Sequence, residues 1–79
     1  MFTTYVLYSM KFDRIYIGQT NNLELRLKQH NQGKSKSTKH YAPWVLIHSE
    51  SFSSRAEAMK RENELNPDFE IAYFLLQLK

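Results

Sequence analysis

Two short runs of strand-forming residues near the N-terminus limit the fold more than any other feature of the chain. Residues 5–8 read Tyr-Val-Leu-Tyr and residues 15–17 read Ile-Tyr-Ile, both rich in β-branched and aromatic side chains. The polar connection at residues 11–14 has the length of a hairpin loop, although it lacks an Asn-Gly or Asp-Gly pair. The chain is therefore expected to begin with an antiparallel hairpin whose second strand is closed by Gly18.

A helix and a polar loop are expected after this hairpin. The helix spans residues 23–31, because Asn21 or Asn22 can cap its start and Gly33 is suited to its end. Residues 32–41 place serine and threonine between lysines, a composition typical of a loop.

The second half of the chain predicts one strand and two helices. Residues 44–48 form an apolar run that follows a proline and predicts a third strand. Ser54 begins a capping-box pattern, serine followed three residues later by glutamate, and opens a helix that runs to about Leu65. The Asn-Pro pair that follows disfavours continuation. Asp68 can cap a last helix, whose apolar residues recur at helical spacing: Phe69, Ile71, Ala72, Phe74, Leu75 and Leu78.

The predicted element order is ββαβαα, an α+β fold in which a small three-stranded antiparallel sheet is flanked by helices. A chain of 79 residues with 42% hydrophobic residues makes one small domain, so residues 1–79 are expected to fold as a single unit. The chain has no cysteine, which excludes disulfides and thiolate zinc sites. No apolar run approaches the roughly 20 residues of a membrane span and no signal peptide is visible, so a cytoplasmic protein without a membrane partner is expected.

Positive charge is concentrated in the middle third of the chain, although the net charge is only +3. Against a single acid at Glu24, residues 22–41 contain these basic residues: Arg26, Lys28, His30, Lys34, Lys36, Lys39 and His40. From Glu50 onward there are six acids and four bases. Such a distribution is suited to local contact with a polyanion, and an ordinary solvated basic loop is the alternative.

Five residues have side chains suited to chemistry, yet each has an ordinary structural explanation. Tyr5 and Tyr16 lie in the two predicted strands, where aromatic pairs often pack, but a phenol can also accept a proton or contact a phosphate. Arg26 adjoins the apolar stripe of the first helix, which ends at His30, and a snorkelling arginine is common there. Glu62 falls within the apolar stripe of the second helix, where it is either a boundary residue or a metal ligand.

The joint spacing of these residues resembles the GIY-YIG nuclease superfamily, in particular its short stand-alone bacterial members. Residues 16–18 read Tyr-Ile-Gly, the second half of the name motif, and Tyr5 stands eleven residues before it, at the place of the tyrosine in the first half. The basic loop with its Pro-Trp strand, residues 39–44, and the Glu-Ala helix, residues 52–62, also resemble the short members. The resemblance covers about residues 5–65.

The resemblance implies hydrolysis of DNA phosphodiester bonds with one divalent cation, Mg²⁺ or Mn²⁺, in DNA repair or recombination. Arg26, ten residues after Tyr16, matches the catalytic arginine, which would stabilise negative charge on the phosphate. Glu62 matches the metal-binding glutamate, a hard oxygen ligand. Tyr5 is expected to be the general base and Tyr16 to position the phosphate. His30 matches a helix position that assists catalysis in some members.

Two departures from the family pattern and two alternatives accompany this interpretation. Thr3 stands where the first motif usually has glycine, and residues 63–70 lack the lysines that short members usually carry there, which weakens the expected basic surface. One alternative is a DNA-binding module that keeps the fold but turns over poorly. It would contact phosphates through Lys28, Lys34, Lys36, Lys39 and His40. The other is a protein-interaction domain in which the tyrosines and Glu62 merely pack.

Overall fold

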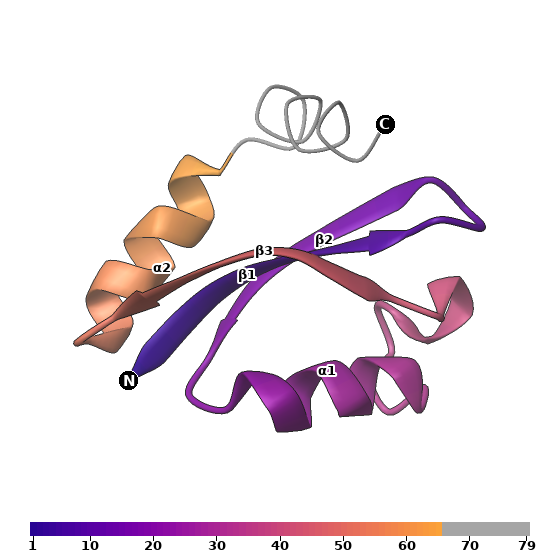
Figure 1. The fold of residues 1–79 in the computed structure, drawn as a ribbon, viewed down its shortest axis with the longest axis horizontal. Helices are drawn as coiled ribbons and strands as arrows, with labels where there is room; N and C mark the ends of the chain where they lie inside the picture. Colours follow the sequence, from indigo (N-terminus) through magenta and orange to yellow (C-terminus); the bar gives the residue numbers. More distant parts are fainter. Residues whose placement is uncertain (66–79) are drawn as a thin grey trace.

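The computed structural model describes residues 1–65 of the chain. Figure 1 shows how the strands and helices of this part are arranged. In chain order the elements are β1 (Phe2–Ser9), β2 (Arg14–Thr20), α1 (Leu23–Asn31), the short 3₁₀ helix η1 (Lys39–Tyr41), β3 (Val45–Phe52) and α2 (Arg55–Glu64). The predicted α+β class and the order ββαβα are confirmed, with η1 added inside the predicted loop. The predicted last helix, which begins at Asp68, lies outside the described residues.

The three strands form one antiparallel sheet in the order β2-β1-β3, so β1 is the central strand. Tyr5 pairs with Gly18 and Tyr16 pairs with Leu7, which places the two tyrosines on the same face. The prediction that Gly18 closes the second strand is wrong, because the glycine sits inside the ladder and β2 continues to Thr20. β1 and β3 also extend beyond their predicted ranges.

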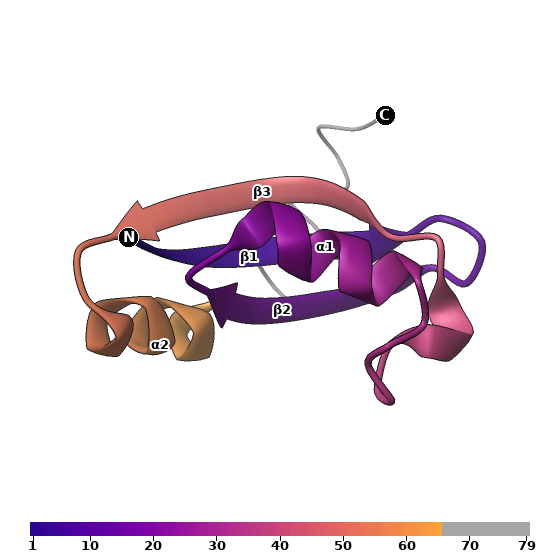
Figure 2. The same cartoon turned by 90° about the horizontal axis from the view of Figure 1, so that it is seen from below.

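The two faces of the sheet are covered by different helices. Figures 1 and 2 show α1 against one face and α2 on the other side, towards the β2 edge. On the α1 face, Tyr5 and Leu7 form a core with Trp44, against which the α1 residues Leu23 and Leu27 pack. Since side chains alternate along a strand, Thr4 and Val6 point to the α2 face, where both are fully buried. The sheet therefore divides a small core into two parts.

Both helices begin at the capping residues that the sequence indicates. The Asn22 side chain accepts a hydrogen bond from the Leu25 amide and caps α1. At α2 the Ser54 hydroxyl accepts from the Glu57 amide at 3.2 Å and donates to the Glu57 carboxylate at 3.0 Å. Ser54 and Glu57 thus pair as the predicted capping box requires, except that the carboxylate accepts from the Ser54 hydroxyl. The predicted starts of both helices are confirmed.

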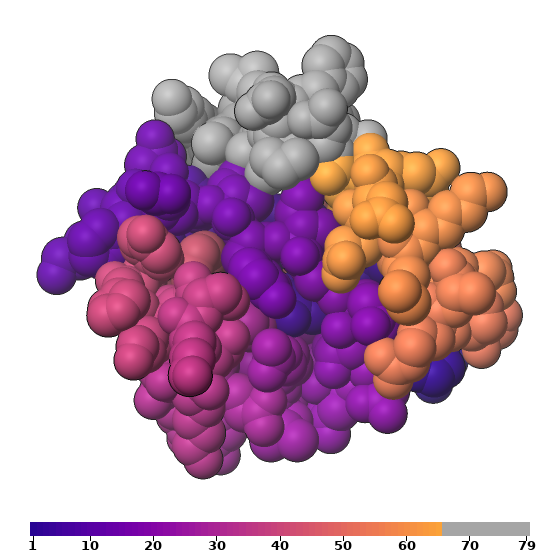
Figure 3. Space-filling model, turned by 180° about the vertical axis from the view of Figure 1, so that it is seen from behind, coloured from indigo at the N-terminus to yellow at the C-terminus, as the bar shows by residue number. Residues whose placement is uncertain are grey.

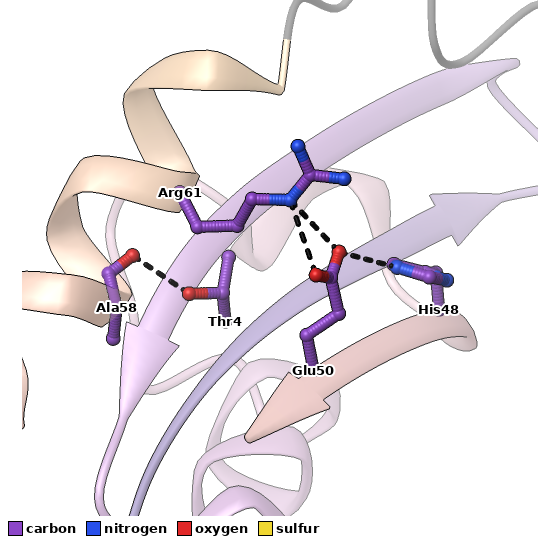
Figure 4. Close-up of polar contacts among 5 residues, drawn as sticks. All are labelled: Thr4, His48, Glu50, Ala58 and Arg61. Carbon is purple, nitrogen blue, oxygen red and sulfur yellow. Dashed lines mark hydrogen bonds and ion pairs between the residues drawn. The ribbon is translucent and has the colours of Figure 1, made fainter. Parts of the chain in front are cut away.

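Two contacts fix α2 against the sheet, and Figure 4 shows both. The buried Thr4 hydroxyl donates to the Ala58 carbonyl at 2.7 Å. On β3, Glu50 accepts from Arg61 Nε at 3.2 and 2.9 Å and also pairs with His48 at 2.8 Å. These contacts fix the position of α2 over the sheet and its rotation about its own axis. Because Arg61 directly precedes Glu62, they also fix the placement of the candidate metal ligand.

None of the helices in residues 1–65 is long and apolar enough to cross a membrane. The longest of them, α2, has ten residues, against the roughly 20 that a span needs. The expected cytoplasmic location and the single domain over residues 1–79 stay predictions.

Replacing Thr4 by valine should lower the free energy of unfolding by about 1 kcal/mol, because a buried hydrogen bond to Ala58 is lost at nearly constant volume. Urea denaturation followed by circular dichroism measures the change. Thr3→Val is the matched control, since this neighbouring hydroxyl has no side-chain hydrogen bond within residues 1–65 and should change the stability by less than about 0.5 kcal/mol. An equal loss in both variants would contradict the importance of the Thr4 bond.

Candidate active site

Two tyrosines from adjacent strands meet on the α1 face of the sheet. The ring centroids of Tyr5 and Tyr16 lie 6.2 Å apart. Gly18 makes this approach possible, because a Cβ at position 18 would lie 2.7 Å from the Tyr5 hydroxyl oxygen and 3.0 Å from Cε1 of Tyr16. The glycine of the Tyr-Ile-Gly run is therefore required by the two rings beside it, and the chain shows no turn there.

His30 reaches the same place from the last turn of α1. It is completely buried, with its ring centroid 4.9 Å from that of Tyr16 and 6.0 Å from that of Tyr5. Nε2 lies 3.0 Å from the Tyr5 hydroxyl oxygen, and Nδ1 lies 2.7 Å from the Thr38 hydroxyl oxygen. Both ring nitrogens thus have a hydrogen-bond partner, so the ring is held in one orientation.

Arg26, one helical turn before His30, completes the cluster. Burial lowers the pKa of Arg26, but its hydrogen-bonding and charge interactions with Tyr5 and Tyr16 outweigh burial and raise it. Its Nη1 also donates to the Gln29 side-chain oxygen at 3.2 Å. A guanidinium can only donate, so the Tyr5 oxygen faces a donor and its own proton is directed at His30 Nε2. The His30 tautomer that fits carries its proton on Nδ1 and donates to Thr38.

Burial decides the charge states of this cluster. It raises the pKa of Tyr5 to about 12, with a further contribution from Tyr16, while Arg26 acts in the opposite direction. Burial, together with the charge of Arg26, lowers the pKa of His30 to about 4. At neutral pH His30 is therefore uncharged and Tyr5 keeps its proton. Tyr5 can accept another proton only while it passes its own to His30.

Glu62, on α2, lies within electrostatic range of this cluster. Its charge contributes to the raised pKa of Tyr5, and burial raises the pKa of Glu62 itself. The carboxylate is half-buried and makes no hydrogen bond or ion pair with another residue of the range 1–65. Such a carboxylate, partly desolvated and without a cationic partner among residues 1–65, is suited to hold a divalent cation through its oxygens. Figure 3 shows α1 and α2 on either side of β2.

Residues 1–65 contain no group of three or more histidine, aspartate and glutamate side chains that could hold a metal ion. A cation at Glu62 would therefore take most of its ligands from water and substrate, as Mg²⁺ commonly does. The donor chemistry of the site is compatible with Mg²⁺ or Mn²⁺.

Sequence reasoning missed Thr38. The residue is 1% exposed, and its carbonyl accepts a hydrogen bond from the Trp44 indole at 3.0 Å. It lies among lysines in a segment without hydrophobic periodicity, so no local pattern distinguishes it from its exposed neighbours. Only the folded loop brings it to His30.

The residues predicted to bind DNA do not join the cluster. All of them are exposed on α1, the following loop and η1: Lys28, Lys34, Lys36, Lys39 and His40. Exposure leaves them accessible to phosphates, and their role stays a prediction.

Comparison with known proteins identifies relatives over most of the described chain. Residues 1–70 match the model of the GIY-YIG catalytic domain. A UPF0213 protein of Staphylococcus haemolyticus is 48% identical over 56 residues, which cover 70% of this chain and 68% of that relative. The UPF0213 protein YazA of Bacillus subtilis is 52% identical over 48 residues, which cover 60% of this chain but only 48% of YazA. The chain thus spans about half to two thirds of the length of these relatives.

One solved structure supports the same relationship. The solution NMR structure of a UPF0213 protein from Bacillus halodurans superimposes with a TM-score of 0.51 at 32% sequence identity. The match covers 100% of this chain and 86% of that protein.

Lowering the pH should destabilise the fold through His30. Its pKa rises from about 4 in the folded protein to about 6.5 in the unfolded chain, so the unfolded state takes up the proton first as the pH falls. The free energy of unfolding should keep its full value above pH 6.5. It should fall between pH 6.5 and 4, by up to roughly 3 kcal/mol. Denaturant titrations across this window measure the loss.

Two variants serve as controls for this pH dependence. His30→Gln cannot take up the proton, so it should be less stable at pH 7 but should lose this part of the pH dependence. His40→Gln, at an exposed position, should keep it. The interpretation fails if wild type and His30→Gln lose stability equally between pH 6.5 and 4.5.

Proposed function

The chain belongs to the GIY-YIG nuclease family, and we propose that it is a metal-dependent DNA endonuclease that hydrolyses phosphodiester bonds with one divalent cation. The observation that carries the proposal is the cluster of Tyr5, Tyr16, Arg26 and His30. These side chains come from three different elements and touch one another, with the Glu62 carboxylate in electrostatic range. Packing alone does not require an arginine and a carboxylate at the same place.

Arg26 and Tyr16 would bind the phosphate. The half-buried guanidinium faces two phenols and has donors in a planar fork that fits phosphate oxygens. Because it is partly removed from water, it stabilises developing negative charge more than an exposed arginine would. The Tyr16 ring is half-buried beside His30, so its hydroxyl is available to hold a phosphate oxygen.

Tyr5 would act as the general base together with His30. As Tyr5 takes a proton from the attacking water, its own proton passes to His30 Nε2, 3.0 Å away. His30 then carries a proton on each nitrogen, and its Nδ1–H remains hydrogen-bonded to Thr38. The charge of Arg26 disfavours the imidazolium that forms, and a phosphate bound at Arg26 would offset this charge. Tyr5, with a pKa of about 12, is protonated at rest, so it can act as a base only if its own proton passes to His30 in this way.

Glu62 would hold the cation. A divalent ion bound there supplies positive charge to the phosphate and to the leaving oxygen. The contacts of Thr4 with Ala58 and of Arg61 with Glu50 keep the carboxylate in place without using its oxygens. Burial raises the pKa of Glu62, so cation binding would be weakened by mild acid.

A second candidate is a DNA-binding module of the same fold with weak turnover. The pKa of Tyr5, raised to about 12, favours it, because a site that fails to pass the proton to His30 has no effective base. Its exposed basic residues would still bind phosphates.

Arg26→Ala should lower the rate of DNA cleavage by a factor of about 100 to 1,000, because one donor to the transition-state charge is lost. Glu62→Gln keeps the side-chain volume and removes the metal-binding charge, so cleavage should fall to background. Both variants should fold and bind DNA, because neither residue supplies apolar burial and the lysines remain. Gel assays with Mg²⁺ or Mn²⁺ measure cleavage, and fluorescence anisotropy without metal measures DNA binding.

Glu64→Gln is the matched control, an exposed glutamate on the same helix, and should cut as wild type does. Equal cutting by wild type and Glu62→Gln would mean that the metal site is misassigned. A wild type that binds DNA but never cuts with either cation would favour the binding module.

A further inference from the structure

We propose that the tip of the β1–β2 hairpin and the neighbouring η1 bind unpaired DNA bases, and so direct the candidate site to DNA with single-stranded or branched segments. This hairpin platform consists of Lys11, Phe12 and Arg14 from the hairpin and Tyr41 from η1. The inference rests on the proposed function for the identity of the polymer. Its evidence is the arrangement of the platform itself.

The platform presents an aromatic ring that the core does not use. Phe12 is 43% exposed at the end of the hairpin. Its ring stands edge-on to Tyr41, with centroids 5.5 Å apart and planes at 81°. Tyr41 in turn packs against the buried Trp44 at 6.4 Å, so the exposed ring rests on a fixed support. A rigid exposed aromatic ring is the usual stacking surface for an unpaired base.

Cations lie over both rings of the platform. Lys11 Nζ is 5.6 Å from the Phe12 ring centroid, and the Arg14 guanidinium carbon is 4.9 Å from that of Tyr41. Each is positioned to meet a phosphate next to a stacked base. This charge favours a polyanion over an apolar protein partner.

The acid at the tip is already engaged. Asp13 is the one acidic residue of the connection, and its carboxylate accepts a hydrogen bond from the Tyr8 hydroxyl at 2.8 Å. Its backbone has φ of 52°, a left-handed conformation that aspartate tolerates better than most residues. The aspartate therefore shapes the turn, and the exposed Lys39 of η1 adds positive charge beside the platform.

The platform is continuous with the candidate active site. Tyr41 contacts Trp44, which contacts Tyr16 with ring centroids 6.4 Å apart, and Tyr16 belongs to the catalytic cluster. Phe12 and Tyr16 are only four residues apart along the hairpin, so their backbones are separated by at most about 13 Å, the length of four extended residues. A few nucleotides reach both places.

Unpaired bases explain the platform better than duplex DNA does. Inside a duplex each base is covered by its neighbours, so an exposed ring gains little from contact with it. An unstacked base offers a free π-face, which lysines alone cannot recognise. The proposed substrate is therefore DNA with unpaired nucleotides close to the cleaved bond.

Phe12→Ala should weaken binding to DNA with a single-stranded overhang by roughly 5- to 100-fold, the loss expected for one stacked base. Binding to a blunt duplex of the same length should stay within about twofold, because phosphate contacts remain. Fluorescence anisotropy of labelled DNA without divalent cations measures both affinities while preventing cleavage. Phe12→Trp should restore overhang binding, and Met10→Ala, which removes an exposed apolar side chain at the same tip, should leave it unchanged.

The outcomes separate this inference from the proposed function. No loss in Phe12→Ala, or an equal loss for overhang and duplex, overturns the platform even if the wild type cuts DNA with Mg²⁺. Tighter binding of the RNA strand of the same sequence overturns the assignment to DNA. If the wild type binds overhang DNA through Phe12 but no cation supports cutting, the platform stands and the nuclease proposal fails.

Discussion

The hydrogen bond between the Tyr5 hydroxyl and His30 Nε2 joins the central strand to α1, and the candidate site depends on it. Both residues are almost fully buried, so neither polar group can exchange its partner for water without cost. Gly18 leaves room for the tyrosine on one side, and Thr38 holds the second ring nitrogen on the other. The contact that joins α1 to β1 therefore also fixes the positions of the Tyr5 and His30 protons.

The second half of the site depends on a separate set of contacts across the other face of the sheet. Thr4 and Tyr5 are neighbours on β1 but point in opposite directions, so one strand anchors α2 through Ala58 and α1 through His30. The position of Glu62 relative to Tyr5 is thus set through a single strand.

Local chemistry predicted much of the fold, and the spacing of four residues predicted the candidate site. Asn22 and Ser54 cap helices by bonds within three residues, so a short window of sequence contains the whole signal. Thr38 and the place of Gly18 inside β2 could not be found in this way. Both are defined by residues distant in sequence, His30 in one case and Tyr5 in the other, that only the folded chain brings near.

The central claim is that Glu62 and the tyrosine cluster form one metal-assisted centre, and Mn²⁺-induced broadening of NMR signals tests it most directly. Sub-stoichiometric Mn²⁺ should first broaden the signals of Glu62, Tyr5 and Tyr16, spare Phe12 at the hairpin tip, and lose this selectivity in Glu62→Gln. Selective broadening elsewhere, for example around Glu50, that persists in Glu62→Gln would contradict the account.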